Sequence, residues 1–198
     1  MGSGLAAAAG LNAWMPLFAL GLADRFLPAI TLPDAWSWLS GDVALWITGI
    51  LLVVELVADK VPAVDSINDV IQTVVRPAAG GVAFGAGSTA ESFRIEDPSS
   101  LFQNNAWIPV VIGVVIALGM HAFKAGIRPV ANLATAGAAA PILSTAEDAS
   151  ALSLVVTAFF APVLTVLIIV AFIVGAIVVL RRLHRRRLKR ESSAEPLL

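Results

Sequence analysis

The chain contains no cysteine, and only 14% of its 198 residues are charged. The absence of cysteine excludes disulfides, thiolate nucleophiles and cysteine-ligated metal sites. Soluble domains are about one-quarter charged, whereas this chain is 58% hydrophobic and has a mean hydropathy of +0.87. The composition therefore predicts an integral membrane protein that has no soluble domain of useful size.

The few charges are unevenly distributed along the chain. Seven of the thirteen lysines and arginines lie in the stretch RRLHRRRLKR at Arg181–Arg190, so the remainder is net acidic although the formal net charge is −1. We expect a single transmembrane domain over residues 1–180 and a basic, disordered cytoplasmic tail over residues 181–198. The tail should attract anionic lipid by about 1 kcal/mol per basic residue near the surface. Its place directly after a membrane helix argues against nucleic acid as its partner.

Apolar segments of the length that a bilayer requires, about 20 residues, recur along the chain. Four are clear: Leu5 to Ala23, Val43 to Ala58, Ala106 to Phe123 and Ala151 to Leu180. Two further segments are rich in alanine and glycine and contain prolines: Val64 to Gly87 and Arg128 to Ser144. We predict that all six cross, which gives an all-α membrane helix bundle whose third and fifth helices are Ala/Gly-rich and interrupted at their prolines. The alternative for these two segments is a re-entrant path.

The basic tail sets the predicted orientation, because loops rich in lysine and arginine stay in the cytoplasm. Six crossings then place both termini in the cytoplasm, in a bacterial inner membrane. The loops at Lys60 and at Lys124–Arg128 are expected on that same side, and residues 24–42 and 88–105 on the outer side.

The segment from Asp59 to Arg76, DKVPAVDSINDVIQTVVR, places ionisable side chains between two apolar segments. Read as a helix, it puts Asp65, Asp69 and Arg76 on one face. A carboxylate inside a membrane helix is a functional candidate by default, because a charge there is costly. Hard cations bind carboxylate and amide oxygens, and a proton-coupled carrier requires a carboxylate that changes its protonation. The predicted solute or ion site therefore combines acidic, amide and basic residues: Glu55, Asp59, Asp65, Asn68, Asp69, Arg76, Arg128, Asn132 and Asn12.

The three kinds of residue would have different roles at this site. Acids such as Glu55 would bind a cation or an exchanged proton, and the asparagines would add neutral ligands. Arg76 and Arg128, each followed by proline, would balance the charge or bind an anion at a helix N-terminus. The alternative is charge pairing inside the bundle without any solute, in which Glu55 pairs with Lys60, Lys124 or Arg128.

Little in the sequence points to catalysis. His121 could titrate near neutral pH, although an interfacial position is the usual one for such a histidine. No second histidine has metal-ligand spacing, which disfavours zinc. The sequence has no glycine-rich phosphate loop and no nucleophile elbow. We therefore expect no enzyme activity and no cofactor, and leave open whether a metal ion binds.

Three stretches carry a family resemblance: AGLNAWMPLFALGLADRF, ELVADKVPAVDSINDVIQTVVRPAAG and AGIRPVANLATAGAAAPILSTAEDASAL. Over roughly Gly4 to Leu180 the chain resembles a bacterial multi-pass membrane family catalogued as domain of unknown function 4126. The resemblance implies an inner-membrane protein and carries over no substrate and no functional residue. In addition, ELVADK at Glu55–Lys60 is similar to the Glu-x-Gly-Asp-Lys/Arg motif of cation/proton exchangers. Here the two acids are four residues apart instead of three, and Ala58 replaces the glycine.

These observations predict a transporter of a small solute or ion that has a polar site inside the membrane. Its expected partners are the lipid bilayer, the solute and a second copy of the chain in a homo-oligomer. The alternative is a non-transporting membrane scaffold, or a lipid-associated subunit of a larger complex, in which the polar residues only hold the helices together.

Overall fold

The fold is all-helical over the residues that the structure describes, as the composition predicts. The computed structural model describes residues 1–89, 107–135, 138–161, 163–171, 173–175, 177–178 and 181, and no strand occurs among them. Within the helices, the side chains of Asp65 and Asn132 are outside this description, as is the basic tail that follows Arg181. The elements are, in chain order, α1 (Gly2–Leu11), α2 (Trp14–Phe26), the 3-10 helix η1 (Asp34–Ser40), α3 (Asp42–Ala58), α4 (Pro62–Thr89), α5 (Trp107–Thr135) and α6 (Ala140–Phe160).

The chain changes direction at Asn12, inside the first predicted crossing. The backbone of Asn12 is extended (φ −144°, ψ 116°), which ends α1, and α2 begins at Trp14. The segment Leu5 to Ala23 is therefore two helices and not the single crossing that its apolar length predicts. The break has a local cause in Pro16. In a continuous helix this proline would lack the N–H that bonds the Asn12 carbonyl oxygen, and its ring would clash with that carbonyl.

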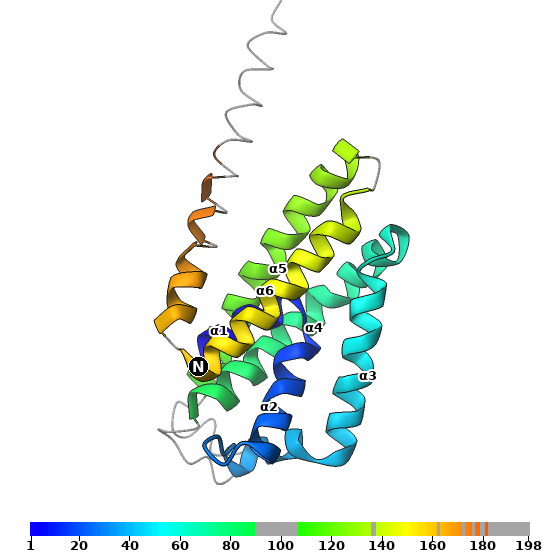
Figure 1. Cartoon of the computed structure of the whole chain (residues 1–198). Helices are drawn as coiled ribbons and strands as arrows, with labels where there is room; N and C mark the ends of the chain where they lie inside the picture. Colours follow the sequence, from blue (N-terminus) through cyan, green and yellow to red (C-terminus); the bar gives the residue numbers. More distant parts are fainter. Residues whose placement is uncertain are drawn as a thin grey trace, which may run out of the picture.

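Both ends of this helix pair lie at one end of the bundle, beside the C-terminal part of α4. A Cβ atom at Gly2 would lie 2.9 Å from the carbonyl oxygen of Phe84, so α1 starts against the last turns of α4. α2 leads to η1, where the Trp36 ring would lie 2.9 Å from a Cβ atom at Gly85. We call α1, α2 and the turn at Asn12 the helical hairpin, because it enters and leaves the bundle at the same end (Figure 1).

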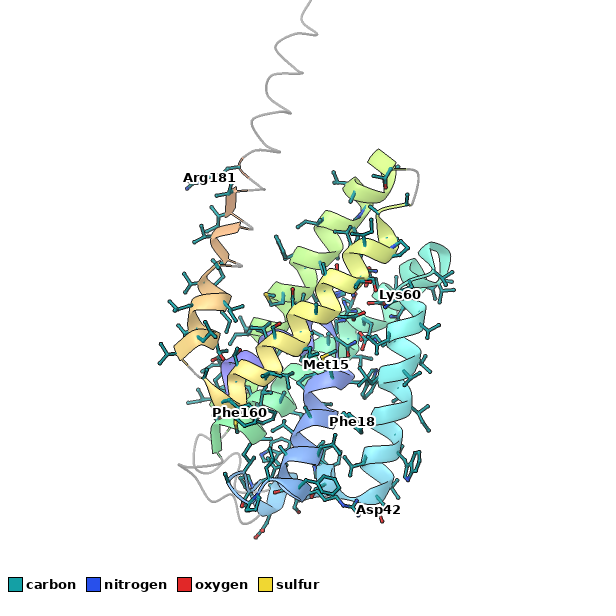
Figure 2. The ribbon with its side chains drawn as sticks, in the orientation of Figure 1. Met15, Phe18, Asp42, Lys60, Phe160 and Arg181 are labelled. Atoms are coloured by element: carbon teal, nitrogen blue, oxygen red, sulfur yellow. The ribbon has the colours of Figure 1, made fainter. Side chains whose placement is uncertain are left out.

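The two ends of the described chain lie at opposite ends of the bundle. A Cβ atom at Gly4 would lie 2.9 Å from the Cβ atom of Ala158, which places the start of α1 beside the last turns of α6. From Phe160 the next helical segment runs back along the bundle to Arg181 (Figure 2). The side of the membrane on which each terminus lies stays a prediction, and the helical hairpin replaces the first of the six predicted crossings.

α4 and α5 are long, continuous helices of 28 and 29 residues. Pro77 lies inside α4 and Pro129 inside α5. Neither proline interrupts its helix, contrary to the prediction. The segment Arg128 to Ser144 is not a crossing of its own, because it contains the last turns of α5 and the first turn of α6. Lys124–Arg128, predicted as a loop, is also part of α5. Prolines are tolerated inside membrane helices because neighbouring groups satisfy the freed backbone carbonyl.

Several helices have the length and apolarity of membrane spans. Residues Trp107–Ala131 of α5 and the whole of α6 each satisfy both criteria, and η1 with α3 adds a third span if this pair, bent by 62°, is counted as one. Many of the outward side chains of the bundle are large and apolar, among them Trp46, Val70 and Leu133. These helices indicate that the protein associates with a membrane.

Small residues hold the helical hairpin in the middle of the bundle. Nine of the ten residues of α1 are buried. A Cβ atom at Gly10 would lie 2.5 Å from the carbonyl oxygen of Ala117, and one at Gly80 would lie 2.9 Å from the carbonyl oxygen of Gly113. Only small residues permit such close approach of helix backbones. The tip of the helical hairpin is therefore fixed between α4 and α5.

Candidate functional site

The irregular backbone at the tip of the helical hairpin is bound by charged side chains. The Ala13 N–H donates to Oε2 of Glu55 at 3.0 Å, and Lys124 Nζ donates to the Leu11 carbonyl oxygen at 3.4 Å. The side chain of Asn12 accepts a hydrogen bond from the Met15 N–H at 3.0 Å and so caps α2. Irregular backbone at membrane depth is tolerated only where the protein supplies such partners or a water-filled cavity.

Glu55 forms a fully buried ion pair with Arg76. Its Oε1 atom accepts from Arg76 Nη2 at 2.9 Å and from Nε at 3.3 Å, and neither side chain is more than 1% exposed. Together with the Ala13 N–H, these contacts give the Glu55 carboxylate three donors. Such a pair is stable in a low-dielectric interior only when further hydrogen bonds satisfy it in this way.

The same arginine fixes the tautomer of His121. Arg76 Nη1 lies 3.1 Å from His121 Nδ1, and because a guanidinium can only donate, Nδ1 must be the acceptor. The ring proton is then on Nε2, which lies 3.1 Å from the Thr73 hydroxyl oxygen and can donate to it. Thr73 in turn donates to the Asp69 carbonyl oxygen at 2.9 Å. His121 is thus a buried neutral link between two turns of α4, not an interfacial residue.

Asp59, the first residue after α3, is the centre of a second group of contacts. Its Oδ2 atom lies 2.6 Å from Lys124 Nζ, 3.4 Å from Arg128 Nη2 and 3.5 Å from Arg76 Nη2. Its Oδ1 atom accepts from Asn68 Nδ2 at 2.8 Å. One carboxylate therefore bridges three cations from α4 and α5.

Glu147 of α6 completes the network and was not identified from the sequence. It accepts from Arg128 through both oxygens, at 3.2 Å from Nε and 2.5 Å from Nη2, and lies 3.2 Å from Lys124 Nζ. This bidentate geometry is the strong form of an arginine–carboxylate pair. The available signal was the spacing of Lys124 and Arg128, one helical turn apart, which calls for an acid facing both. The predicted helix boundaries hid it, because they left Glu147 between two crossings.

The structure brings most of the predicted site residues together. We define the charge cluster by the predicted residues that meet at the hairpin tip and by the three added to them: Asn12, Glu55, Asp59, Asn68, Asp69, Arg76 and Arg128, with Lys124, His121 and Glu147. The side chains of Asp65 and Asn132 are outside the described part of the chain, so their place at the site stays a prediction. Lys60 lies apart from the cluster and pairs with Asp148 at 3.0 Å.

The charge cluster has more acidic than basic side chains among the described residues. Its described side chains include four carboxylates, those of Glu55, Asp59, Asp69 and Glu147, against three cations. Asp69 has the weakest pairing, since its Oδ1 atom lies 3.6 Å from Arg76 Nη1 and its side chain is 18% exposed. No three histidine or carboxylate side chains of the described residues are placed as metal ligands, because the cations lie between the acids.

The charge cluster also has polar atoms that the described residues leave without a hydrogen-bond partner. One is Nδ2 of the buried Asn12. A further unpaired atom is Oε1 of Gln72, a buried side chain outside the cluster that lies one helical turn before Arg76 in α4. A cavity of about 140 Å³ lies beside the cluster between α1, α5 and α6, lined by Leu11, Lys124 and Glu147 among others. Buried polar atoms are almost always paired, so the unpaired atoms of Asn12 and Gln72 indicate places for bound water.

Comparison with known proteins returns one family. The model of a domain of unknown function (DUF4126) matches residues 1–182, which include every described residue of the charge cluster. No curated protein and no solved structure matches the chain.

Proposed function

The chain belongs to the DUF4126 family, whose description names no activity, and from its buried charges we propose that it is a membrane transporter of a small ion or solute. The observation that carries the proposal is the pair of contacts at the hairpin tip, Ala13 with Glu55 and Leu11 with Lys124. Broken helices whose exposed backbone meets charged groups near the middle of the membrane are typical of transport sites.

The cost of the charge cluster supports a functional role over a purely structural one. Ionisable side chains inside a membrane bundle are expensive and usually mark ion or substrate pathways. Packing alone would be achieved more cheaply by apolar side chains of the same volume. The unpaired atoms of Asn12 and Gln72 add polar groups that could bind a transported species.

The surplus of carboxylates favours a cation or a proton as the transported or coupled species. Binding of one positive charge would neutralise the described part of the charge cluster. Asp69 is the best placed of the four carboxylates, because it is the most weakly paired and lies partly exposed. Arg76 then balances charge, and an anion is the less favoured solute.

The fold changes the proposed orientation. Positive charge at Arg181 and beyond marks the cytoplasmic side of a bacterial inner membrane, and Lys60 lies at the end of α3 that is nearer to Arg181, opposite the end that carries Asp42 (Figure 2). The N-terminus then lies on the outer side, and the helical hairpin is re-entrant from there. On this account the charge cluster is reached from the outside along the hairpin and from the cytoplasm past Lys60.

Flux measurements on purified protein in proteoliposomes test this proposal. Protons, monovalent and divalent cations and small anions are imposed one at a time as gradients, with empty liposomes as the control. We expect protein-dependent flux of a cation or of protons. Flux of an anion alone would contradict the assignment of a cation or a proton as the transported species. No flux of any ion by folded protein would contradict ion transport.

A second function, as a non-transporting scaffold, is favoured by one specific observation. The ion pairs of Glu55, Asp59 and Glu147 are closed in this structure, as they would be if their only role were to hold helices together. In that case replacement of a cluster residue lowers stability without any solute-specific effect.

A further inference from the structure

The helix α3 and the first turns of α4 meet the rest of the bundle through polar side chains. Among the described residues 42–72, the buried side chains are all polar: Thr48, Glu55, Asp59 and Gln72. The hydroxyl of Thr48 bonds within its own helix, to the Ala44 carbonyl oxygen at 2.7 Å. We call residues 42–72 the acidic arm, which lies at the edge of the bundle (Figure 1). No fully buried apolar side chain holds the described part of this arm in place.

The second half of α4 packs in the opposite way. After Pro77 its buried side chains are small and apolar, such as Ala83. A Cβ atom at Gly81 would lie 3.2 Å from the Val110 carbonyl oxygen in α5, so this half of α4 is tightly fixed. Pro77 lies between the two halves and lacks the N–H that would bond the Thr73 carbonyl oxygen. The helix can therefore bend here with one hydrogen bond fewer to break.

The Asp42 end of the acidic arm has a pivot and apolar contacts of its own. α3 follows η1 at a bend of 62°, and hinges are commonly residues at the ends of elements. Apolar contacts with α2 lie in this half of α3. A Cβ atom at Gly21 would lie 2.8 Å from Leu45 Cδ2, and one at Gly49 would lie 3.2 Å from Phe18 Cε2. The arm is thus packed near its Asp42 end and held by charge near its Lys60 end.

Charges of opposite sign meet where the acidic arm contacts the rest of the bundle. The arm supplies the carboxylates of Glu55, Asp59 and Asp69 to the charge cluster. The charged and titratable groups that face them from the rest of the bundle are Arg76, His121, Lys124, Arg128 and Glu147. Glu147 of α6 also binds Lys124 and Arg128, so these two cations keep a carboxylate if the arm moves away. An acid on the arm that gains a proton or a bound cation loses its attraction to the cations.

A more exposed ion pair closes the Lys60 end of the acidic arm. Lys60 Nζ lies 3.0 Å from Asp148 Oδ2 of α6, and the Lys60 side chain is 43% exposed. Exposed pairs of this kind contribute little to stability. Lys60 and Asp42 lie at opposite ends of α3 (Figure 2). The Lys60 end can therefore open once the buried charges release it.

We propose that the acidic arm is the gate of the charge cluster. It pivots at Gly41 and around Pro77, and it opens at the Lys60 end when a proton or a cation neutralises one of its carboxylates. A ligand shifts such an equilibrium only through a difference in its interaction with the two states. Here that difference is the charge attraction that only the closed state has. The inference deepens the proposed transport function and rests on it, because the opening gives the transported ion its way past Lys60.

Distances between spin labels test the movement without any flux measurement. The full-length protein carries one label on α6, at Leu152→Cys, and a second on α3, at either Val57→Cys or Val43→Cys. All these side chains are exposed, and the chain has no cysteine of its own. Each pair is measured in proteoliposomes by double electron–electron resonance, with the wild-type charges and with Glu55→Gln. Asp42→Asn, which removes an acid of the arm outside the charge cluster, is the matched control.

We expect a second, longer distance from Val57 to Leu152 that is several-fold more populated in Glu55→Gln than with the wild-type charges or in Asp42→Asn. The distance from Val43 should not change, because this end is the pivot. A single unchanged distance from Val57 in a Glu55→Gln protein with the wild-type helical circular-dichroism spectrum would overturn the proposal. Equal lengthening of both distances would do the same. If Glu55→Gln does not fold, Asp69→Asn, which breaks the fewest contacts, carries the same prediction.

A reversible bridge separates the gate from the transport function itself. Lys60→Cys with Asp148→Cys is joined by a short bifunctional methanethiosulfonate. The control bridge joins Arg25→Cys with Asp42→Cys, which replace an ion pair at the pivot end. We expect the first bridge to abolish protein-dependent ion flux until it is reduced, and the control bridge to leave the flux unchanged.

The outcomes of this second experiment differ for the two proposals. Wild-type flux through the protein bridged between positions 60 and 148 would overturn the gate and leave the transport function standing. Flux of no ion in the wild type would contradict transport, and the distances from Val57 to Leu152 would still decide whether the acidic arm opens.

Discussion

Arg76 is the residue on which most of the charge cluster depends. It is fully buried and contacts Glu55, Asp59, Asp69 and His121. Removing one partner of a buried ion pair leaves the other charge uncompensated, which is much more costly than removing both.

We therefore predict that Arg76→Gln lowers the free energy of unfolding by about 3–5 kcal/mol, measured by denaturant titration in detergent. The double variant Glu55→Gln, Arg76→Gln should be more stable than Arg76→Gln alone, because it removes the unpaired carboxylate. Lys60→Gln is the control, since its partly exposed pair with Asp148 should contribute only about 0–1 kcal/mol. A double variant less stable than the single one would show that the Glu55 charge is not what Arg76 balances.

At the scale of the element, one of the contacts that hold the tip of the helical hairpin is a backbone donor that can be removed on its own. Ala13 has φ −65°, the angle of proline, and Asn12 before it is extended, as a residue before proline prefers to be. Ala13→Pro therefore deletes the N–H that donates to Glu55 and fits the local backbone.

We predict that Ala13→Pro destabilises the protein by about 1–3 kcal/mol, the value of a hydrogen bond to a charged group, in thermal unfolding monitored by circular dichroism. The effect should be non-additive with Glu55→Leu, since both changes remove the same contact. Full additivity of the two changes would contradict the contact between the hairpin tip and Glu55.

The close packing of the helical hairpin gives a second prediction at this scale. A Cβ atom at Gly10 would lie 2.5 Å from both the Ala117 carbonyl oxygen and the Met120 Cβ atom, whereas one at Gly126 would meet nothing within 4 Å. Gly10→Ala should cost about 1–3 kcal/mol through overpacking. Gly126→Ala, in the interior of α5, should be neutral or stabilising by up to about 1 kcal/mol. Equal effects on the unfolding midpoint would show that α1 does not pack against α5 this closely.

Part of this element structure follows from the sequence, and the reasons for the failures are physical. The helical character, the extent of α4 and the meeting of Glu55, Asp69 and Arg76 follow from apolar length and helical spacing. The break at Asn12 was not predicted, although Pro16, four residues later, disfavours a continuous helix there. The bond from Ala13 to Glu55 that stabilises the break is long-range and could not be predicted. The prolines caused the opposite error, because they predicted breaks in α4 and α5 that the structure does not have. The energetic cost of a proline inside these helices is offset by packing. Glu147 was missed because its partner Arg128 lies on another helix, nineteen positions away.

At the scale of the whole molecule, the proposed orientation places the N-terminus on the outer side, because the helical hairpin enters and leaves at one end of the bundle. The absence of cysteine makes this testable, because single engineered cysteines react without background. We predict that a membrane-impermeant thiol reagent added from outside labels Asp34→Cys and Ser3→Cys, and that Lys60→Cys is labelled only after permeabilisation. Labelling of Ser3→Cys from the same side as Lys60→Cys would contradict this account, because it would show that the chain crosses the membrane between the N-terminus and η1.

The central claim is that the charge cluster at the hairpin tip is a transport site, and Asp69 is the residue that tests it most directly. Its carboxylate is the least paired of the four, so Asp69→Asn removes the surplus charge and breaks the fewest contacts. Asp34→Asn in η1, far from the cluster, is the matched control.

The decisive measurement is ion flux into proteoliposomes containing wild type, Asp69→Asn and Asp34→Asn, with the unfolding midpoint of each protein determined in parallel. The account predicts that Asp69→Asn retains its midpoint and loses at least tenfold in flux, an effect on the order of 1.4 kcal/mol in free-energy terms, while Asp34→Asn transports like the wild type. Wild-type flux in a folded Asp69→Asn variant would contradict the claim.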